Sequence, residues 1–116
     1  MENCLFCKIV QGQIPSDKVY EDEKVLAFKD INPAAPVHVL VIPKQHIDGV
    51  DQLDAEHAEL IGKLILTIKK IAHDLSLTKG WRIVTNILED GGQTVRHLHF
   101  HLLGGGQLGD FGSKYR

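Results

Sequence analysis

The segment His97-Leu98-His99-Phe100-His101-Leu102-Leu103 is the most informative stretch of the chain. Side chains on a β-strand alternate between faces, so its histidines are expected to share one face and its apolar residues the other. The apolar side chains would anchor in a core while the imidazoles line a different surface. A strand with a solvated polar face explains the alternation alone. Three imidazoles within five residues, however, bring together groups that titrate near neutral pH, which favours a functional site.

Two kinds of chemistry fit these imidazoles: metal binding, or phosphate chemistry with one imidazole as the nucleophile and the others as donors. The His-x-His-x-Asp-His pattern of metallo-β-lactamase-like hydrolases lacks its acidic member, because Leu102 and Leu103 follow His101. A cupin would need a longer all-β chain and a glutamate ligand. Upstream, Gly91-Gly92-Gln93-Thr94 offers flexible backbone N–H groups that can surround an anion, although a plain turn explains the two glycines equally well. This segment favours phosphate.

The remaining sequence predicts an α+β domain. Apolar residues recur every three or four positions between Asp54 and Leu75, which indicates a long amphipathic helix with Asp54 as its N-cap and Lys79-Gly80 near its end. A short helix is expected near the front of the chain, where Gly12 and Pro15 stop it. The expected helical turns span 4–10, and the expected strands span 18–21 and 25–29 (a hairpin), 38–43, 81–86 and 97–103.

Composition limits the function classes. The 116 residues, of which 43% are hydrophobic and 24% charged, fit one globular domain. A net charge of −2 gives no reason to expect nucleic-acid binding, and the apolar runs are too short for a membrane span. No signal-peptide pattern is visible, and Cys4 and Cys7 cannot build a disulfide framework, so a cytoplasmic location is expected.

These motifs together resemble a known family. The pattern HLHFHLL is similar to the signature of the histidine triad (HIT) superfamily, and the surrounding segments resemble its Hint-like nucleoside phosphoramidase branch in order and spacing. The resemblance implies a HIT-like fold with a five-stranded antiparallel sheet, one long helix and one short helix. It implies a single HIT domain over residues 1–116, with a variable tail from about 106 to 116 that departs from the Trp-Pro-Pro-Gly ending of animal members. The segments are FKDIN (28–32), PAAPVHVLVIPKQHI (33–47), KGWRIVTN (79–86) and GGQTVRHLHFHLLGG (91–105).

The resemblance also implies a catalytic group. His99 corresponds to the histidine that attacks the α-phosphorus of a nucleotide, and a neutral imidazole suits that role. His101 and His38 correspond to supporting histidines that hold the nucleophile and donate to the phosphate. The residues that correspond to phosphate or leaving-group contacts are Asn86, Gly92, Gln93 and Thr94.

The nucleoside is expected to contact a carboxylate and an apolar slot. Asp30 corresponds to the ligand of the ribose hydroxyls, although a residue at this place could equally cap a turn. The residues that correspond to the apolar slot for the base are Leu5, Phe6, Ile9, Phe28, Ile31 and Leu40, of which Leu5, Ile9 and Leu40 are also ordinary core residues.

The Cys-x-x-Cys pair could by itself be redox-active, metal-binding or accidental. It resembles the zinc-binding version found in bacterial Hint-like proteins, which implies a structural zinc ion held by Cys4, Cys7, His46 and His97. Four protein ligands leave no open position, so no catalytic metal is expected, and His97 is assigned to the metal rather than to the chemistry. Two reduced, half-buried thiols are the alternative.

The function implied is hydrolysis of a purine nucleoside 5′-phosphoramidate, or of the related acyl-adenylate, through a covalent nucleotidyl-histidine that releases the nucleoside monophosphate. A dinucleoside polyphosphate hydrolase or a nucleotidyltransferase is one alternative. A nucleotide-binding or interaction module with little turnover is another. The resemblance further implies a homodimer formed through the long helix and the fourth and fifth strands.

Overall fold

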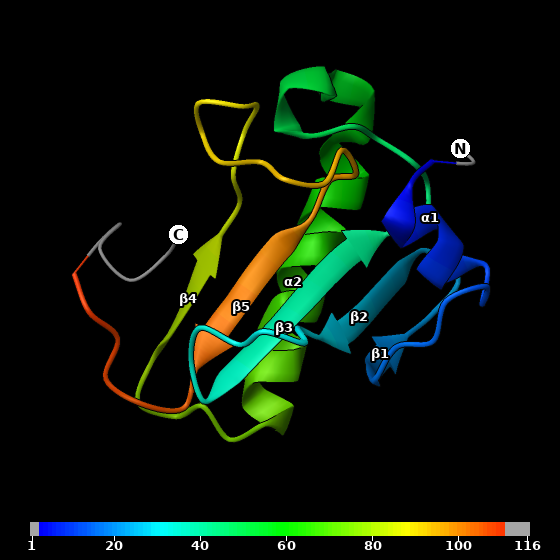
Figure 1. Cartoon of the computed structure of the whole chain (residues 1–116). Helices are drawn as coiled ribbons and strands as arrows, with labels where there is room; N and C mark the ends of the chain where they lie inside the picture. Colours follow the sequence, from blue (N-terminus) through cyan, green and yellow to red (C-terminus); the bar gives the residue numbers. More distant parts are fainter. Residues whose placement is uncertain (1–2, 111–116) are drawn as a thin grey trace.

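The computed structural model describes residues 3–110, in which five strands form one antiparallel sheet in the order β1-β2-β3-β5-β4 (Figure 1). The predicted fold class is confirmed. The hairpin of the first two strands lies at one edge, and β5 is inserted between β3 and β4. The elements are α1 (Leu5–Val10), β1 (Lys18–Glu21), β2 (Val25–Lys29), β3 (Val37–Pro43), the 3-10 turn η1 (Val50–Gln52), the 3-10 turn η2 (Ala55–His57), α2 (Ala58–Asp74), β4 (Trp81–Val84) and β5 (Phe100–Gly104).

The two faces of the sheet carry different helices. The long helix α2 covers one face, where Leu64, Ile68 and Ile71 pack with Val39 and Val41 of β3 and with the alternating apolar residues of the histidine segment. The short helix α1 lies on the other face of the sheet. Along the strands, the side chains that pack toward α1 alternate with those that pack toward α2. This second cluster consists of Phe6, Ile9, Leu26, Phe28, Leu40 and Ile42. The histidines belong to the α1 face.

The long helix α2 begins at Ala58, with His57 rather than the predicted Asp54 at its N-cap position, and it ends before the predicted stop. Asp54 accepts from the backbone N–H of Glu56 and caps the 3-10 turn η2, which leads directly into α2. The helix ends at Asp74 rather than near Lys79-Gly80, because Ser76 adopts a left-handed backbone conformation with φ of 60°. The N–H groups of Ser76 and Leu77 then close a Schellman motif, at 3.0 Å each, on the carbonyls of residues 73 and 72.

The fourth and fifth strands are shorter than the sequence predicted. Backbone pairing stops at Val84 opposite His101 on one side, and at Val41 opposite Phe100 on the other. β5 therefore begins at Phe100, and His97 and His99 precede the ladder. The ladder stops here because these backbone groups have other partners. Leu98 N–H donates to the carbonyl of Ile47, and the hydroxyl of Thr85 donates to the carbonyl of His99.

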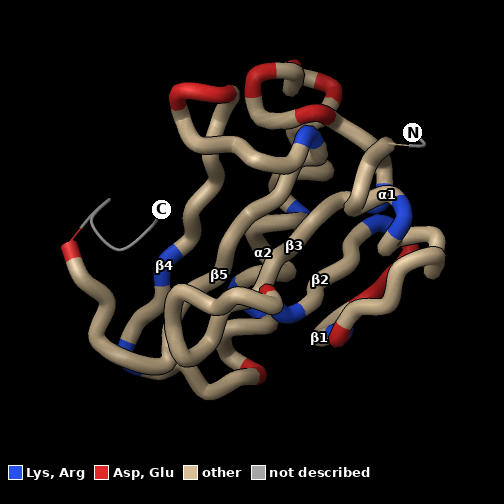
Figure 2. The backbone as a smooth tube through the Cα atoms, in the orientation of Figure 1, with Lys and Arg blue, Asp and Glu red and all other residues tan. Residues whose placement is uncertain are grey.

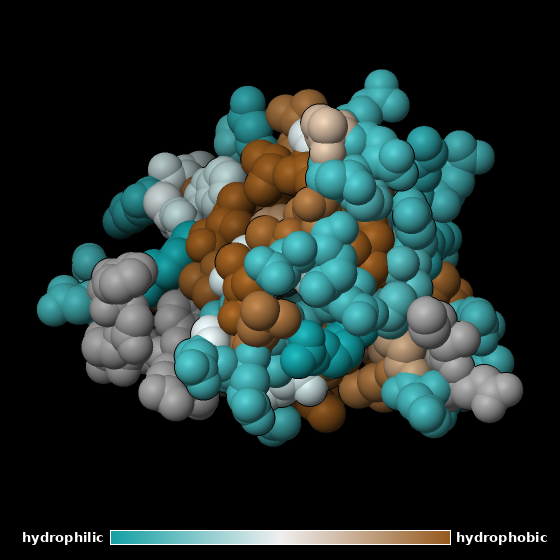
Figure 3. All heavy atoms as spheres, turned by 90° about the horizontal axis from the view of Figure 1, so that it is seen from above, coloured by the Kyte–Doolittle hydropathy of each residue, from teal (hydrophilic) through white to brown (hydrophobic). Residues whose placement is uncertain are grey.

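The surface is uneven in charge and polarity. Figure 2 shows that acidic residues gather on the loops at one end of the sheet, in the turn before α2 and in the loop after β4. Figure 3 shows apolar side chains gathered over the middle of the face seen from above. Among residues 3–110, no helix is both long and apolar enough to cross a membrane. Arg82 donates to the carbonyl of Gly109 at 2.7 Å, and residues 111–116 of the expected variable tail lie outside the described residues.

Candidate active site and metal centre

His99 has a fixed ring tautomer. Its Nδ1 lies 2.7 Å from the backbone carbonyl of His97, and a carbonyl only accepts, so Nδ1 carries the proton and Nε2 keeps the lone pair. The ring is buried and its centroid lies 5.1 Å from that of Phe6, edge to face. Burial lowers the pKa of His99 below its usual value. The side chain is therefore a neutral imidazole at neutral pH, with an unprotonated lone pair on Nε2.

His38 and His101 form a hydrogen-bonded pair beside His99. The backbone N–H of Ala34 donates to His38 Nδ1 at 3.0 Å, so the proton of neutral His38 is on Nε2. That Nε2–H faces His101 Nδ1 at 2.9 Å, which leaves the proton of neutral His101 on Nε2. Burial, with His99 and His38 nearby, lowers the pKa of His101 to about 4, and burial also lowers the pKa of His38. The backbone N–H of Ala34 thus places the ring protons of both His38 and His101 on Nε2.

Asp30 joins this pair through one oxygen and caps a turn through the other. Its Oδ1 accepts from the backbone N–H of Asn32 at 2.8 Å, which is the turn-capping role that the sequence left open. Its Oδ2 lies 3.5 Å from His38 Nε2. The carboxylate raises the pKa of His38 and so opposes the larger effect of burial. Asp30 therefore both caps a turn and lies next to His38.

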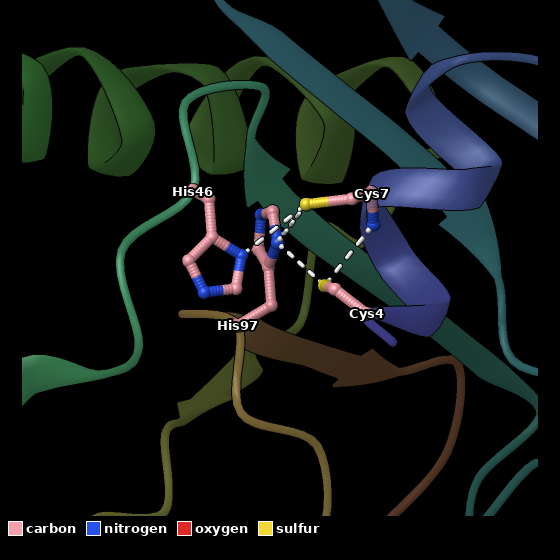
Figure 4. A group of neighbouring side chains, drawn as sticks. All are labelled: Cys4, Cys7, His46 and His97. Carbon is pink, nitrogen blue, oxygen red and sulfur yellow. Dashed lines mark hydrogen bonds between the residues drawn. The ribbon is translucent and has the colours of Figure 1, made fainter. Parts of the chain in front are cut away.

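The four predicted metal ligands converge (Figure 4). Cys4 and Cys7 come from the N-cap and the first turn of α1, His46 from the loop after β3, and His97 from the segment before β5. Sγ of Cys7 lies 3.2 Å from Nδ1 of His46 and 3.5 Å from Nδ1 of His97, and Sγ of Cys4 lies 3.3 Å from the same His97 atom. The four donor atoms all lie within 4.8 Å of one another, close enough to hold a metal ion.

The remaining hydrogen bonds of the two rings suit metal binding. His97 Nε2–H donates to the carbonyl of Pro43 at 2.8 Å, and His46 Nε2–H donates to Oδ1 of Asp48 at 2.7 Å. Both rings therefore turn an Nδ1 lone pair toward the sulfurs, which is how metal-binding imidazoles are commonly oriented. Bonds of about 2.3 Å to sulfur and about 2.0 Å to nitrogen in a tetrahedral zinc site would separate the two atoms by roughly 3.5 Å. The donor set fits a tetrahedral metal.

Asp30, His38 and His101 also lie close enough together to be considered for a metal, but their hydrogen bonds argue against one. Because Ala34 N–H occupies Nδ1 of His38, the proton of that ring sits on Nε2, in the middle of the group. A metal there would have to displace this proton and break the His38–His101 bond. The geometry instead supports a hydrogen-bond relay.

The predicted phosphate contacts lie in the loop between β4 and β5. Gln93 uses its side-chain amide within the protein: it accepts from Leu88 N–H at 3.0 Å and donates to the carbonyls of Asp48 at 2.6 Å and Val95 at 3.0 Å. Gly92 has a φ of 88°, and a side chain there would lie 3.9 Å from the amide of Asn86. Thr94 lines a pocket of about 630 Å³ beside His46. Gln93 orders this part of the loop, and none of the hydrogen bonds described for Asn86, Gly92, Gln93 or Thr94 reaches His99.

The predicted nucleoside contacts divide by exposure. Phe6, Ile9, Phe28 and Leu40 are buried in the core under α1, as any core residues would be, and Phe6 touches the rings of both His97 and His99. Leu5 is 45% exposed and Ile31 is 91% exposed, so these two can meet a ligand directly. Leu5 lines the same pocket as Thr94.

Sequence reasoning missed the groups that orient the histidines. These are the backbone N–H of Ala34, the carbonyls of Pro43 and His97, the carboxylate of Asp48 and the hydroxyl of Thr85. The backbone groups leave no trace in residue type. Asp48, two residues after His46, and Thr85, beside Asn86, were visible in the sequence but carried no pattern of their own.

The fold and the site define an α+β protein with a triad of histidines, His97, His99 and His101, on one face of its sheet, the first two buried and the third half-buried. The HIT domain pattern matches residues 11–108, and the chain belongs to the HIT domain family.

Curated relatives match over nearly the whole chain. The sequence is 54% identical to an uncharacterized HIT-like protein of Synechococcus elongatus, over 92% of this chain and 94% of that one. It is 45% identical to the purine nucleoside phosphoramidase of Escherichia coli K12, over 93% and 92%. The solved structure of a HIT family hydrolase from Clostridium thermocellum has a TM-score of 0.92 at 50% identity, over 96% and 97%. These similarities confirm the HIT-like fold.

Proposed function

We propose that this protein is a hydrolase that cleaves the P–N bond of purine nucleoside 5′-phosphoramidates, and the corresponding bond of acyl-adenylates, releasing the nucleoside monophosphate. The observation that carries the proposal is the fixed tautomer of His99, whose Nδ1–H bond to the His97 carbonyl leaves Nε2 as a neutral nucleophile. The similarity to a purine nucleoside phosphoramidase and to a HIT family hydrolase supports the reaction class.

In the first step, His99 Nε2 attacks the α-phosphorus and forms an N–P bond as the bond to the leaving amine breaks. Positive charge develops on the imidazole, and the Nδ1–H bond at 2.7 Å to the His97 carbonyl stabilises it. The departing nitrogen takes a proton from solvent and leaves as the amine. Asp30, near the relay, is the proposed acceptor for the ribose hydroxyls, and Leu5 and Ile31 are the exposed candidates for contact with the base.

In the second step, water attacks the same phosphorus and releases a proton to solvent, the N–P bond breaks, and His99 regains its neutral form as the monophosphate departs. The relay from Ala34 through His38 to His101 directs the Nε2–H of His101 away from His38, as a donor for a phosphoryl oxygen. Because the pKa of His101 lies at about 4, this donor is neutral at neutral pH. Asn86, Gly92 and Thr94 are the proposed loop contacts to the phosphate or leaving group; binding through the Gln93 side chain requires its amide to exchange partners.

The metal that we propose for the Cys/His cluster is Zn²⁺, held by Cys4, Cys7, His46 and His97. When bound, it supplies structural cross-linking only, because four protein ligands leave no open position. These ligands join α1 to the loop after β3 and to the segment that carries His99. The side chain of His97 would thereby bind the metal, while its backbone carbonyl accepts the hydrogen bond from the His99 ring.

We also propose that the protein is a cytoplasmic homodimer. The long helix exposes large apolar side chains, with Leu66 at 66% and Ile65 at 37% exposure. β4 is the edge strand of the sheet in the described residues 3–110, where a second copy of the chain could pair with it. Light scattering should give a dimer for the wild type, and Leu66→Glu should weaken it; an unchanged mass would reject α2 as the interface.

The decisive experiment supplies adenosine 5′-phosphoramidate and, separately, a diadenosine polyphosphate to the wild type. We expect faster release of AMP from the phosphoramidate, and quenched samples should contain a nucleotidyl adduct on the peptide that carries His99. Preference for the dinucleotide would favour the dinucleoside polyphosphate hydrolase. Tight nucleotide binding with neither turnover nor adduct would favour a binding module.

A further inference from the structure

The nucleophile lies just beyond the end of the sheet. The last residue pairs of β5 are His101 with Val84 and Phe100 with Val41, so His99 receives no regular ladder pairing from either neighbouring strand. A residue in this position is held by packing, here of its ring against Phe6, and by individual hydrogen bonds. Because catalysis depends on placing Nε2 in line with the leaving group, each of these bonds bears on the reaction geometry.

Besides the bonds of the His97 ring to the Pro43 carbonyl and to the cysteine sulfurs, three described hydrogen bonds hold the segment from His97 to His99. The N–H of Leu98 donates to the carbonyl of Ile47 at 2.7 Å, and the ring of His99 donates to the carbonyl of His97 at 2.7 Å. The third is the hydroxyl of Thr85, which donates to the carbonyl of His99 itself at 2.8 Å. Of the three, only this last bond is made by a side chain that belongs neither to the triad nor to the metal cluster.

We propose that Thr85 is a positioning residue for the nucleophile: its hydroxyl replaces the missing ladder bond and fixes the backbone from which the His99 ring projects. This inference rests on the proposed function of His99. Thr85 is the first residue after β4 and is half-buried, so its backbone is anchored by the sheet while its side chain reaches across to β5. It does not touch the substrate and acts only through His99.

Removing the hydroxyl should move kcat more than KM. Thr85→Val keeps the size and the strand preference of the side chain but leaves the His99 carbonyl without this donor, so the ring is held less firmly. We expect kcat for adenosine 5′-phosphoramidate to fall by about tenfold, the effect of one lost hydrogen bond, with KM unchanged within about twofold. Thr85→Ser, which retains a hydroxyl, should recover most of the loss.

The control is Thr67→Val, which removes a hydroxyl from a buried threonine of α2. This variant should share any general loss of thermal stability but keep the wild-type kcat. If Thr85→Val folds poorly, Thr85→Ala supplies the same comparison without the added methyl group. Equal kcat values for Thr85→Val, Thr67→Val and the wild type would overturn the inference, as would a loss that Thr85→Ser does not recover.

A second readout separates this inference from the proposed function. Ring ¹⁵N NMR of the uniformly labelled protein should show His99 as the Nδ1–H tautomer in the wild type and in Thr67→Val. In Thr85→Val the His99 signals should shift or broaden as the ring gains freedom. A wild type that releases no AMP would reject the proposed function; in that case unchanged His99 signals in Thr85→Val would overturn the positioning role, and altered signals would support it.

Discussion

Two groups of histidines lie on the same face of the sheet and use their rings in opposite ways. In the metal cluster, His46 and His97 donate their Nε2–H groups outward, to Asp48 and Pro43, and turn Nδ1 lone pairs toward the cysteines. In the group proposed for catalysis, which is His38, His99 and His101, protons lie between the rings or between a ring and the backbone, as in the His38–His101 bond. The partner of the second ring nitrogen, rather than the histidine itself, decides which chemistry a ring can perform.

The largest effect should come from removing the proposed nucleophile. His99→Ala deletes Nε2 but leaves the four metal donors in place, so turnover of adenosine 5′-phosphoramidate should fall by at least about 10³-fold while nucleotide binding is nearly intact. AMP release, nucleotide affinity and metal content measured on the same preparation check this. Near-normal turnover would show that the two groups have been assigned to the wrong roles.

The proposed metal cluster of Cys4, Cys7, His46 and His97 should affect the stability of the protein more directly than its turnover. Cys4→Ser with Cys7→Ser removes both sulfur donors, so bound zinc should be lost and the free energy of unfolding should fall by more than about 3 kcal/mol. Metal analysis and thermal unfolding with and without a chelator measure both effects. The chelator should lower the Tm of the wild type and of His99→Ala, but not that of the double variant. Carefully prepared wild type without zinc would contradict the zinc assignment.

The sequence predicted which face of the sheet each side chain occupies better than it predicted where the helices and strands end. Alternation placed Leu98, Phe100 and Leu102 against α2 and the histidines on the opposite face, because the two-residue period continues past the last ladder bond. The structure buries His97 and His99 completely or nearly so, which excludes the solvated strand face. The stop of α2 was missed because Ser76, unlike glycine, gives no sign of a positive φ.

The residues of the two groups were predictable, but their protonation was not. The family resemblance assigns Cys4, Cys7, His46 and His97 to one metal site, and the structure brings their donor atoms together. The tautomers depend on backbone partners at Ala34, Pro43 and His97, which any residue type could supply. Likewise, nothing in the GGQT segment indicated that the Gln93 amide would bond to the backbone of residues 48, 88 and 95.

A pH titration should separate the catalytic pair from the rest of the protein. His101 has a pKa of about 4 when folded, below its usual value of 6.5, so the unfolded chain takes up this proton first as the pH falls. Its contribution to stability is therefore complete above pH 6.5 and is lost progressively down to about pH 4. In this range, a full proton bound only by the unfolded state lowers the free energy of unfolding by about 1.4 kcal/mol per pH unit.

Urea unfolding across this range should show a steeper loss for the wild type than for His101→Gln. The comparison cancels the protonation of the cysteines and of the other histidines that both proteins retain. His73→Gln, which removes an exposed histidine of α2, is the matched control and should keep the wild-type slope. Equal slopes for His101→Gln and the wild type would show that His101 is not held neutral by its surroundings.

The smallest and most specific effect concerns Asp30, which lies at the border of the catalytic group. Asp30→Asn keeps an oxygen to cap the N–H of Asn32 but removes the negative charge that lies 3.5 Å from His38 Nε2. If the carboxylate also accepts from the ribose, ribonucleotide affinity should fall several-fold, about 1 kcal/mol, while that of 2′,3′-dideoxy counterparts should change less. Because the same charge raises the pKa of His38, that pKa should fall further in the variant, which NMR titration can follow without any ligand. Equal losses for both nucleotides, together with a lowered His38 pKa, would assign Asp30 to the relay rather than to the ribose.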